Sequence, residues 1–334
     1  MNADVILDRY DGLLLDLDGT VYRGGSAVAG AVDAVRAAHQ RSVAVRFVTN
    51  NASRSPETVA AQLRDMGLTA DAAEVNTSAQ AAAAVLGDRL EPGSAILVVG
   101  ADALAHEVAD VGLKPVATAE GHVAGVVQGF SPDIGWRVLA EAGIAINAGA
   151  LWVACNLDPT LPTERGALLG NGSLVAALRH ATGADPIVAG KPAKPLMVEA
   201  LAAAGARRAL VVGDRLDTDI AGAVTAGLDS LLVLAGVTTP ADLLAAAPSE
   251  RPDYVSAGPD GVLAEAAELA IAEHPGWRVR LVDGTLRVAG QGESLSLLRA
   301  LCAAWWVGDG GRVAVDADGP AARSALSELG LAGL

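Results

Sequence analysis

Two aspartates, Asp16 and Asp18, stand two residues apart in the segment LLLDLDGT, directly after a short apolar run. If residues 13–15 form a buried strand, both carboxylates project from its end, and Gly19 lets the backbone turn there. One carboxylate can attack phosphorus while its neighbour carries a proton, as a covalent aspartyl phosphate route requires. Two solvated turn aspartates are the alternative, which DxDGT after a strand disfavours.

Two further motifs offer groups that suit phosphoryl oxygens. The segment FVTNNASRS ends an apolar run in Thr49, Asn50 and Asn51, a cluster of hydroxyl, amide and backbone donors. Taken alone, this cluster is explained equally well by an ordinary polar turn. The segment GKPAKP holds Lys191 between a glycine and a proline, so its ammonium group belongs to a restrained loop.

A fourth motif, VVGDRLDTDIAGA, adds more carboxylates at a strand end. Asp214 ends the apolar run, and Asp219 falls in the first turn of the next helix, where the helix dipole favours a carboxylate. Asp217 is explained sufficiently as a helix cap. Because ligands of open α/β sheets bind beyond the carboxyl ends of the strands, we expect the endings of these strands to meet at one site.

Carboxylates at that density need a cation. Four aspartates would face Lys191 and an anionic phosphate, and like charges so close together are not tolerated without compensation. A hard divalent ion with oxygen ligands relieves the repulsion, and Mg²⁺ binds a few carboxylates together with water and substrate phosphate. The sequence therefore predicts a Mg²⁺ site.

The elements that must position these residues follow a βαβ pattern. Short apolar runs alternate with Ala-rich segments of helical length. Residues 13–15, 43–48 and 209–212 are apolar throughout, which is typical of strands buried on both faces of a parallel sheet. We therefore predict an α/β fold.

The length of 334 residues indicates two or three folding units. We predict a discontinuous core of residues 1–78 and 185–270. Residues 79–184 are predicted to form an inserted domain with helices and with strands of its own at 95–99, 123–127 and 151–154. Residues 271–334 are predicted to form a small α/β appendage, in which the Asp-Gly pair at 283–284 signals a hairpin. A helix near 293–306, a strand at 312–315 and a final helix are expected to follow the hairpin.

Composition excludes several classes of function. The net charge is −15 and the basic residues are scattered, so nucleic acid is not an expected partner. Cys155 and Cys302 fit neither a disulfide framework nor a zinc site, which suits a reducing cytoplasm. The first residues do not form a secretory signal, and the charge-free stretch 142–157 is too short to span a membrane. We expect a cytoplasmic protein without a membrane partner.

The ordered set DLDGTVYRG, VTNNASRS, GKP and GDRLDTDI closely resembles the four motifs of haloacid dehalogenase (HAD) phosphatases. More narrowly, it resembles the NagD, 4-nitrophenylphosphatase and phosphoglycolate phosphatase group, which carries a large α/β cap between the second and third motifs. The resemblance covers about residues 10–270. It implies a HAD-like Rossmannoid core with a parallel sheet and an inserted α/β cap.

The resemblance also implies roles for the motif residues. Asp16 would be the nucleophile, and Asp18 the acid toward the leaving oxygen and then the base toward water. The residues holding the phosphoryl group would be Thr49, Asn50 and Lys191. The ligands of Mg²⁺ would be Asp16, the main-chain carbonyl of Asp18, and Asp214, with Asp217 and Asp219 in supporting positions.

In the cap, the stretch CNLDPTLPTERGALLGNGSLV resembles the cap core of that group, which lies over the pocket. The resemblance implies that residues 160–165 form the substrate-facing loop of the cap. Substrate selectivity is therefore predicted to reside in seven residues: Asn156, Asp158, Thr160, Leu161, Thr163, Glu164 and Arg165. A homo-oligomer formed through the cap is left open.

The predicted function is Mg²⁺-dependent hydrolysis of a small phosphomonoester. Because a covering cap favours compact substrates, glycerol 3-phosphate and 2-phosphoglycolate are favoured. The alternatives are a nucleotide or a phosphorylated cofactor as substrate, a phosphomutase, and a non-catalytic phosphate-binding regulator. A haloalkanoate dehalogenase is disfavoured, because it would need neither Asp18 nor the metal carboxylates.

The C-terminal appendage contains a second, weaker resemblance. The run from Arg287 to Gly292, with Gly290 between them, resembles the RxxGxG pyrophosphate loop of GNAT acetyltransferases. Backbone donors at a helix start can bind phosphate. The appendage is too short for a whole acetyltransferase, so a docking or stabilising module is favoured over acetyl-CoA chemistry.

Overall fold

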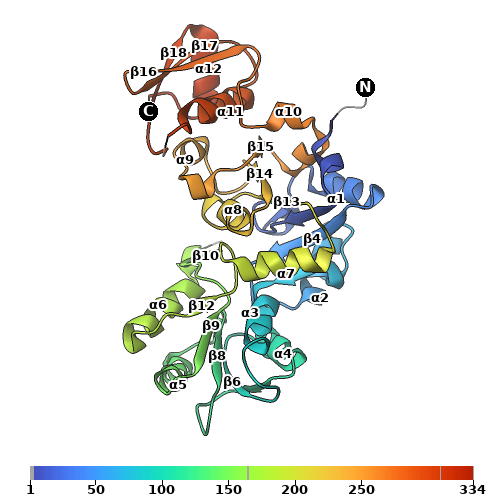
Figure 1. Ribbon diagram of the computed structural model, residues 1–334, viewed down its shortest axis with the longest axis vertical. Coiled ribbons are helices and arrows are strands. Elements are labelled where there is room, and N and C mark those ends of the chain that lie inside the picture. The colour runs from blue at the N-terminus through green and yellow to red at the C-terminus, as the bar shows by residue number, and fades with distance from the viewer. Residues whose placement is uncertain (1–3, 164, 309, 334) are drawn as a thin grey trace. The chain divides into compact units, whose positions relative to one another are not determined.

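The computed structural model describes residues 4–163, 165–308 and 310–333 (Figure 1). The chain forms two compact units. Unit 1 comprises Met1–Arg46, Asp65–Thr69 and Ala203–Leu334, and unit 2 comprises Phe47–Arg64 and Ala70–Ala202. Both contain parallel sheets with helices, which confirms the α/β prediction, whereas the predicted domain boundaries stay a prediction.

Unit 1 is built on four parallel strands in the order β15-β14-β13-β1. These strands are β1 (Gly12–Leu15), β13 (Ala209–Gly213), β14 (Asp229–Val233) and β15 (Tyr254–Ser256). Every residue of β1 and β13 is buried, as their apolar runs predict. Leu15 lies opposite Val212, and the Asp16 N–H donates to the Val212 carbonyl at 2.9 Å. The parallel register therefore brings the residues after β1 and β13 to the same edge.

Shorter elements complete this part of unit 1. They are η1 (Ile6–Arg9), β2 (Tyr22–Arg23), β3 (Ser26–Ala27), α1 (Ala31–Gln40), η3 (Leu216–Ile220), α8 (Ala221–Ala226), α9 (Pro240–Leu244), η4 (Pro248–Glu250), η5 (Pro259–Leu263) and α10 (Ala266–Leu269). Helix α1 buries four alanines and one valine, which form the apolar face of an amphipathic helix. Strand β4 (Ala44–Thr49) starts in unit 1 and ends in unit 2.

Unit 2 contains a parallel sheet in the order β12-β9-β8-β6-β7. Its strands are β6 (Ala95–Val99), β7 (Lys114–Val116), β8 (Gly125–Gln128), β9 (Leu151–Ala154) and β12 (Ile187–Val188). The predicted strands at 95–99 and 151–154 are confirmed, and the one predicted at 123–127 lies at 125–128.

Helices cover both faces of this sheet. Figure 1 shows α3 (Ser78–Gly87) and α4 (Asp102–Asp110) on one side, with α5 (Trp136–Asn147) and α6 (Asn171–Thr182) on the other. The remaining elements of unit 2 are α2 (Pro56–Asp65), η2 (Ala72–Glu74), β5 (Val75–Thr77), β10 (Thr160–Thr163), β11 (Gly166–Leu169) and α7 (Lys194–Ala204). None of the helices in the described part of the chain is long and apolar enough to cross a membrane.

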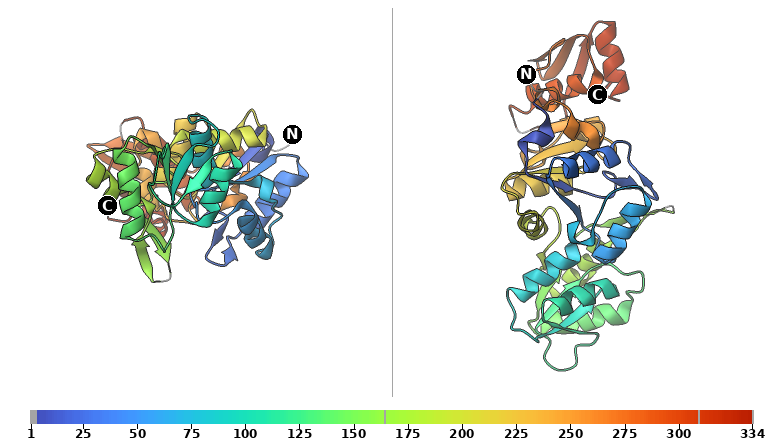
Figure 2. Two further views of the ribbon diagram at one scale, coloured as in Figure 1. Left: turned by 90° about the horizontal axis from the view of Figure 1, so that it is seen from below. Right: turned by 90° about the vertical axis from the view of Figure 1, so that its right-hand side faces the viewer.

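The C-terminal part of unit 1 forms the expected hairpin, helix, strand and helix. It consists of β16 (Trp277–Val282), β17 (Thr285–Gly290), α11 (Ser294–Trp305), β18 (Ala314–Asp318) and α12 (Pro320–Glu328). Both turn residues, Asp283 and Gly284, have positive φ, as the Asp-Gly hairpin signal requires. Figure 2 shows α11 and α12 packed on the three-stranded sheet.

This C-terminal part shares one hydrophobic core with the strands of unit 1. Leu232 and Val255 of β14 and β15 belong to the same buried cluster as Leu286, Leu297 and Leu301. Two arginines reinforce the junction. Arg299, only 3% exposed, donates from Nε to the Val255 carbonyl at 2.9 Å, and Arg251 donates to the Trp306 carbonyl at 3.0 Å. These contacts support the stabilising role that the sequence favours for this segment.

The glycines of the segment that resembles a pyrophosphate loop are explained by contacts inside the protein. A Cβ at Gly290 would lie 2.0 Å from the Gly276 carbonyl oxygen, and one at Gly292 would lie 2.8 Å from Trp277 Nε1. The Gln291 N–H donates to the same Gly276 carbonyl at 2.9 Å. Close backbone packing against the preceding turn therefore requires these glycines without any ligand.

The shared core leads to a stability prediction. We expect Leu301→Ala to lower the free energy of unfolding by about 2–5 kcal/mol, because the fully buried side chain leaves a cavity. The matched control is Val307→Ala, whose side chain is 90% exposed and should change stability by less than about 0.5 kcal/mol. Urea unfolding followed by tryptophan fluorescence measures both effects. Equal stabilities of the two variants would contradict the shared core.

Candidate active site

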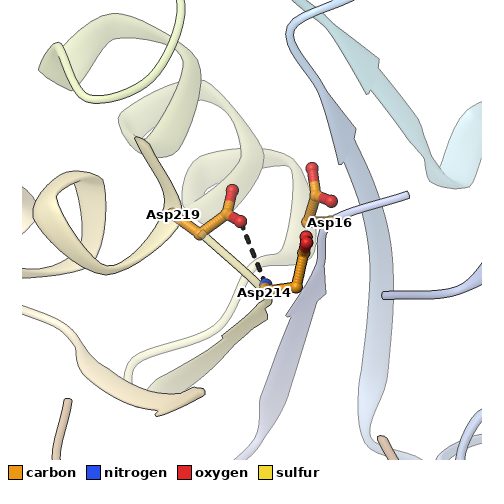
Figure 3. Close-up of side chains that lie close together, drawn as sticks. All are labelled: Asp16, Asp214 and Asp219. Carbon is orange, nitrogen blue, oxygen red and sulfur yellow. Dashed lines mark hydrogen bonds between the residues drawn. The ribbon is translucent and has the colours of Figure 1, made fainter. Parts of the chain in front are cut away.

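Three aspartate side chains gather beyond the carboxyl ends of β1 and β13 (Figure 3). One carboxylate oxygen from each of Asp16, Asp214 and Asp219 lies within 4.8 Å of those from the other two. Asp16 follows β1, Asp214 follows β13, and Asp219 comes from the π-helical turn η3 that comes next in the chain. Asp214 and Asp219 are buried and Asp16 is half-buried. The fold thus unites aspartates of the first and fourth motifs.

The Asp214 carboxylate is fixed by hydrogen bonds and by the small size of its neighbours. Its Oδ2 accepts the Val237 N–H at 2.7 Å, and its Oδ1 accepts the Thr20 hydroxyl at 3.3 Å. A Cβ at Gly236 would lie only 1.8 Å from Asp214 Oδ2, and one at Gly19 would lie 2.4 Å away. Gly19 also has a φ of +96°, which side chains disfavour. The glycine of DxDGT therefore makes room for a carboxylate of the fourth motif.

Asp217 and Asp219 stand two residues apart in η3 but have different surroundings. Asp219 Oδ2 accepts the N–H groups of Asp214 at 3.2 Å and of Arg215 at 3.1 Å, which turns this carboxylate back to the strand end. Asp217 is exposed and forms a two-point pair with Arg215 at 3.0 and 2.7 Å. The Arg215 guanidinium holds the pKa of the Asp217 carboxyl below its usual range. Of the two, Asp219 joins the cluster.

Asp18 lies outside this group of three and is exposed. Its Oδ2 accepts the Tyr22 hydroxyl at 3.2 Å, and the Gly19 N–H donates to the Tyr22 carbonyl at 2.8 Å. Tyr22 therefore closes the turn after β1 and orients the Asp18 carboxylate. An exposed carboxylate exchanges protons readily with water, which suits the predicted acid and base role.

The clustered carboxylates suit a hard divalent cation. Two unit charges 4.8 Å apart repel by about 3 kcal/mol at an effective dielectric constant of about 20. A cation with oxygen ligands relieves this repulsion, and the donors here are oxygens alone, which favours Mg²⁺ over a soft metal. The residues present therefore fit the predicted Mg²⁺, with Asp219 as well as Asp16 and Asp214 offering a carboxylate.

In unit 2, Thr49 and Asn50 stand at the end of β4, and Lys191 lies on the loop after β12. Lys191 is 3% exposed, and its Nζ donates to the Val48 carbonyl at 3.1 Å. Asn50 Oδ1 accepts the Lys191 N–H at 2.8 Å, and Asn50 Nδ2 donates to the Lys191 carbonyl at 3.1 Å. The fold therefore brings the second and third motifs together through the Asn50 amide.

Two of the residues predicted to set selectivity contact this second motif. Asn156 is buried, and its Nδ2 donates to the Asn50 carbonyl at 2.7 Å. Asp158 Oδ2 accepts a hydrogen bond from Asn50 Nδ2 at 3.3 Å. The cap segment after β9 thus lies against the end of β4 within unit 2.

Four other selectivity residues, Thr160, Leu161, Thr163 and Arg165, lie on a β-hairpin. Thr160, Leu161 and Thr163 belong to β10, which pairs antiparallel with β11, and the predicted loop is therefore a strand and its turn. The Arg165 N–H donates to the Thr163 hydroxyl at 3.2 Å at the tip. Glu164 lies outside the described residues.

Several residues that contact the aspartates are not predicted from the sequence. Thr20 and Tyr22 stand inside DLDGTVYRG, and their position in the motif was a signal that could have identified them. Gly236 and the Val237 amide follow β14, and their contact with Asp214 depends on how separate strands pair. No local pattern in the sequence announces such a contact.

Comparison with known families matches three parts of the chain. Residues 13–114 match a haloacid dehalogenase-like hydrolase family, and residues 188–258 match a second HAD-hydrolase-like family. Residues 274–331 match a GCN5-related N-acetyltransferase like domain. The expected resemblance to HAD hydrolases is confirmed, and the weaker one to GNAT proteins is matched as well.

Individual relatives are also similar to the chain. It is 51% identical over 310 residues to D-glycerol 3-phosphate phosphatase from Mycobacterium tuberculosis, covering 90% of this chain and 87% of the relative. The crystal structure of glycerol phosphate phosphatase from M. tuberculosis in complex with magnesium aligns with a TM-score of 0.94 at 50% identity, covering 99% and 100% of the two chains. A thermostable NPPase from Geobacillus stearothermophilus aligns with a TM-score of 0.69 at 33% identity, covering 75% and 97%.

The carboxylate cluster predicts how Mg²⁺ affects stability. Mg²⁺ at a hundred times its dissociation constant should stabilise the parent by about 2.7 kcal/mol, because it binds the folded state. Asp214→Asn removes one charge from the cluster and should lose most of this gain. Asp217→Asn is the matched control and should retain it, since Asp217 pairs with Arg215 instead. Thermal unfolding with MgCl₂ or EDTA makes the comparison, and an equal loss in both variants would contradict the assignment.

Proposed function

Because the chain belongs to the haloacid dehalogenase-like hydrolase family, we propose that it is a Mg²⁺-dependent phosphatase acting on glycerol 3-phosphate. The observation that carries the proposal is a group of three carboxylates within 4.8 Å of one another. This group lies beyond the end of β1, the strand that precedes the DxDGT motif. The substrate is supported by 51% identity to D-glycerol 3-phosphate phosphatase. Figure 3 shows the three side chains.

We assign the two chemical steps to the aspartates of the first motif. A carboxylate oxygen of Asp16 attacks phosphorus, the phosphorus–oxygen bond to the glycerol breaks, and Asp18 gives its proton to the leaving oxygen. Water then attacks the aspartyl phosphate, Asp18 takes the proton, and inorganic phosphate leaves. When bound, Mg²⁺ neutralises negative charge on the carboxylates and the phosphate.

The second and third motifs are assigned to phosphoryl binding. Lys191 supplies a positive charge, and its low exposure strengthens its interaction with an anion. Thr49 supplies a hydroxyl at the end of β4. Asn50 belongs to the same group in our proposal, and its contacts favour an indirect role through Lys191.

Selectivity is proposed to reside in the hairpin of unit 2, because the motif residues recognise only the phosphoryl group common to all substrates. Thr160, Leu161, Thr163 and Arg165 supply its variable chemistry. Asn156 and Asp158, also predicted as selectivity residues, are held by Asn50 and are better suited to support.

The cellular setting is a further proposal. A cytoplasmic location is supported by the free, buried thiols of Cys155 and Cys302.

A homo-oligomer through the cap is supported by the exposed apolar side chains Leu161, Leu168 and Leu169 of the hairpin. Sedimentation of the parent and of a Leu169→Ser variant tests the oligomer, which should dissociate in the variant.

Two substitutions test the chemistry. Asp16→Asn should abolish release of phosphate from glycerol 3-phosphate, because an amide cannot form the covalent intermediate.

Asp18→Asn should reduce the rate by about 10² to 10⁴, with the larger loss for an alkoxide than for 4-nitrophenolate as leaving group. Tyr22→Phe is the matched control, since it keeps both carboxylates, and should cost less than about tenfold. A similar small loss for both leaving groups would refute the acid role.

The hairpin assignment makes a different prediction. Replacing Arg165 and Thr163 together by alanine should change the ranking of kcat/KM among glycerol 3-phosphate, 2-phosphoglycolate and a nucleoside monophosphate. Thr49→Ala should instead depress all three by a similar factor, because it affects the shared phosphoryl group. An unchanged ranking in a folded double variant would place selectivity elsewhere.

A further inference from the structure

Asn50 has a side chain whose hydrogen-bonding capacity is used up within unit 2. A neutral amide offers two N–H donors and one carbonyl acceptor. Asn50 Oδ1 accepts the Lys191 N–H at 2.8 Å, and Nδ2 donates to the Lys191 carbonyl at 3.1 Å and to Asp158 Oδ2 at 3.3 Å. Both donors and the acceptor therefore have protein partners, and no N–H group of this amide is left for a phosphoryl oxygen.

The contact between Asn50 and Lys191 depends on a glycine. A Cβ at Gly190 would lie 2.6 Å from Asn50 Oδ1 and 2.4 Å from the Cys155 carbonyl oxygen. The Gly190 N–H donates to that same carbonyl at 2.8 Å. The third motif is thus held between the end of β4 and the end of β9, and any side chain at position 190 would push it away.

The backbone of Asn50 is held from the cap side. Its carbonyl accepts the Ser78 hydroxyl at 2.6 Å and Asn156 Nδ2 at 2.7 Å, and both donors are buried. Asn156 is fixed in turn, because its carbonyl accepts Asn171 Nδ2 at 2.8 Å. Two buried side chains therefore hold the Asn50 carbonyl.

We propose that Asn50 is a positioning residue that fixes the backbone of Lys191, and that Asn156 and Asp158 of the cap segment act through Asn50 on the same lysine. The inference rests on the proposed function only for its effect on catalysis. Lys191 Nζ donates a hydrogen bond to the Val48 carbonyl. We infer that the position of this ammonium group depends on the hydrogen bonds that link Asn156 and Asp158 through Asn50 to the lysine backbone.

Acylation of lysine provides a test that does not require phosphatase activity. The intact protein is treated with acetic anhydride, and acetylation of Lys191 is measured by mass spectrometry relative to the exposed Lys114. Lys191 should be protected in the parent. In Asn50→Ala we expect its relative acetylation to rise about tenfold, because two hydrogen bonds to its backbone are lost.

The variants are chosen to separate this network from a general loss of structure. Asn156→Ala and the milder Ser78→Ala each remove one hydrogen bond to the Asn50 carbonyl, and each should increase Lys191 acetylation by a smaller factor. Asn51→Ala is the matched control. The Asn51 side chain accepts hydrogen bonds only from Ser53 among the described contacts, so its loss should leave Lys191 protected.

Kinetics complete the test on glycerol 3-phosphate. Asn50→Ala should lower kcat by about tenfold to a hundredfold, since small misplacement of a binding group can have that effect. Adding Asn156→Ala to it should cost less than the product of the two single effects, because both act on one lysine. Unchanged Lys191 protection in all folded variants, or multiplicative kinetic effects, would overturn the proposal. If the parent protein does not hydrolyse glycerol 3-phosphate, the proposed function is refuted. The acetylation result then decides by itself whether Asn50 holds Lys191 in place.

Discussion

Repulsion among Asp16, Asp214 and Asp219 is the constraint on which the structure around them depends. Three carboxylates within 4.8 Å of one another need donors and space in the folded protein. Backbone N–H groups supply much of this compensation, from Val237 to Asp214 and from Arg215 to Asp219. Neutral donors stabilise the carboxylates while leaving oxygen lone pairs for a cation. The site is thereby prepared for Mg²⁺.

Close packing around polar side chains explains three glycines, Gly19, Gly190 and Gly236. Gly19 and Gly236 approach Asp214 so closely that any Cβ would displace the carboxylate, and Gly190 approaches Asn50 in the same way. These glycines therefore serve the geometry of functional side chains more than the flexibility of loops. Buried polar groups held this closely leave little freedom for the charged atoms, and such preorganisation supports the proposed phosphoryl-binding role.

The C-terminal segment shows that a family match and a function are separate matters. Residues 274–331 match an acetyltransferase-like domain, yet the glycines of its loop are used against Gly276 and Trp277. Its helices complete the hydrophobic core beside β14 and β15, and Arg299 links α11 to Val255. The segment therefore contributes to the stability of the unit that holds the clustered aspartates.

The sequence alone determined the class of fold, and it indicated which strands end in the motif aspartates, because apolar runs and the polar residues after them are local patterns. It also predicted the C-terminal hairpin from one Asp-Gly pair. Only the tertiary structure separated Asp219 from Asp217, since a π-helical turn directs one inward and leaves the other to Arg215. It likewise turned the predicted cap loop into a hairpin and assigned Asn50 to Lys191. The hydrogen bonds between Asn50 and Lys191 join residues 141 positions apart, and no local pattern in the sequence encodes a hydrogen bond of that range.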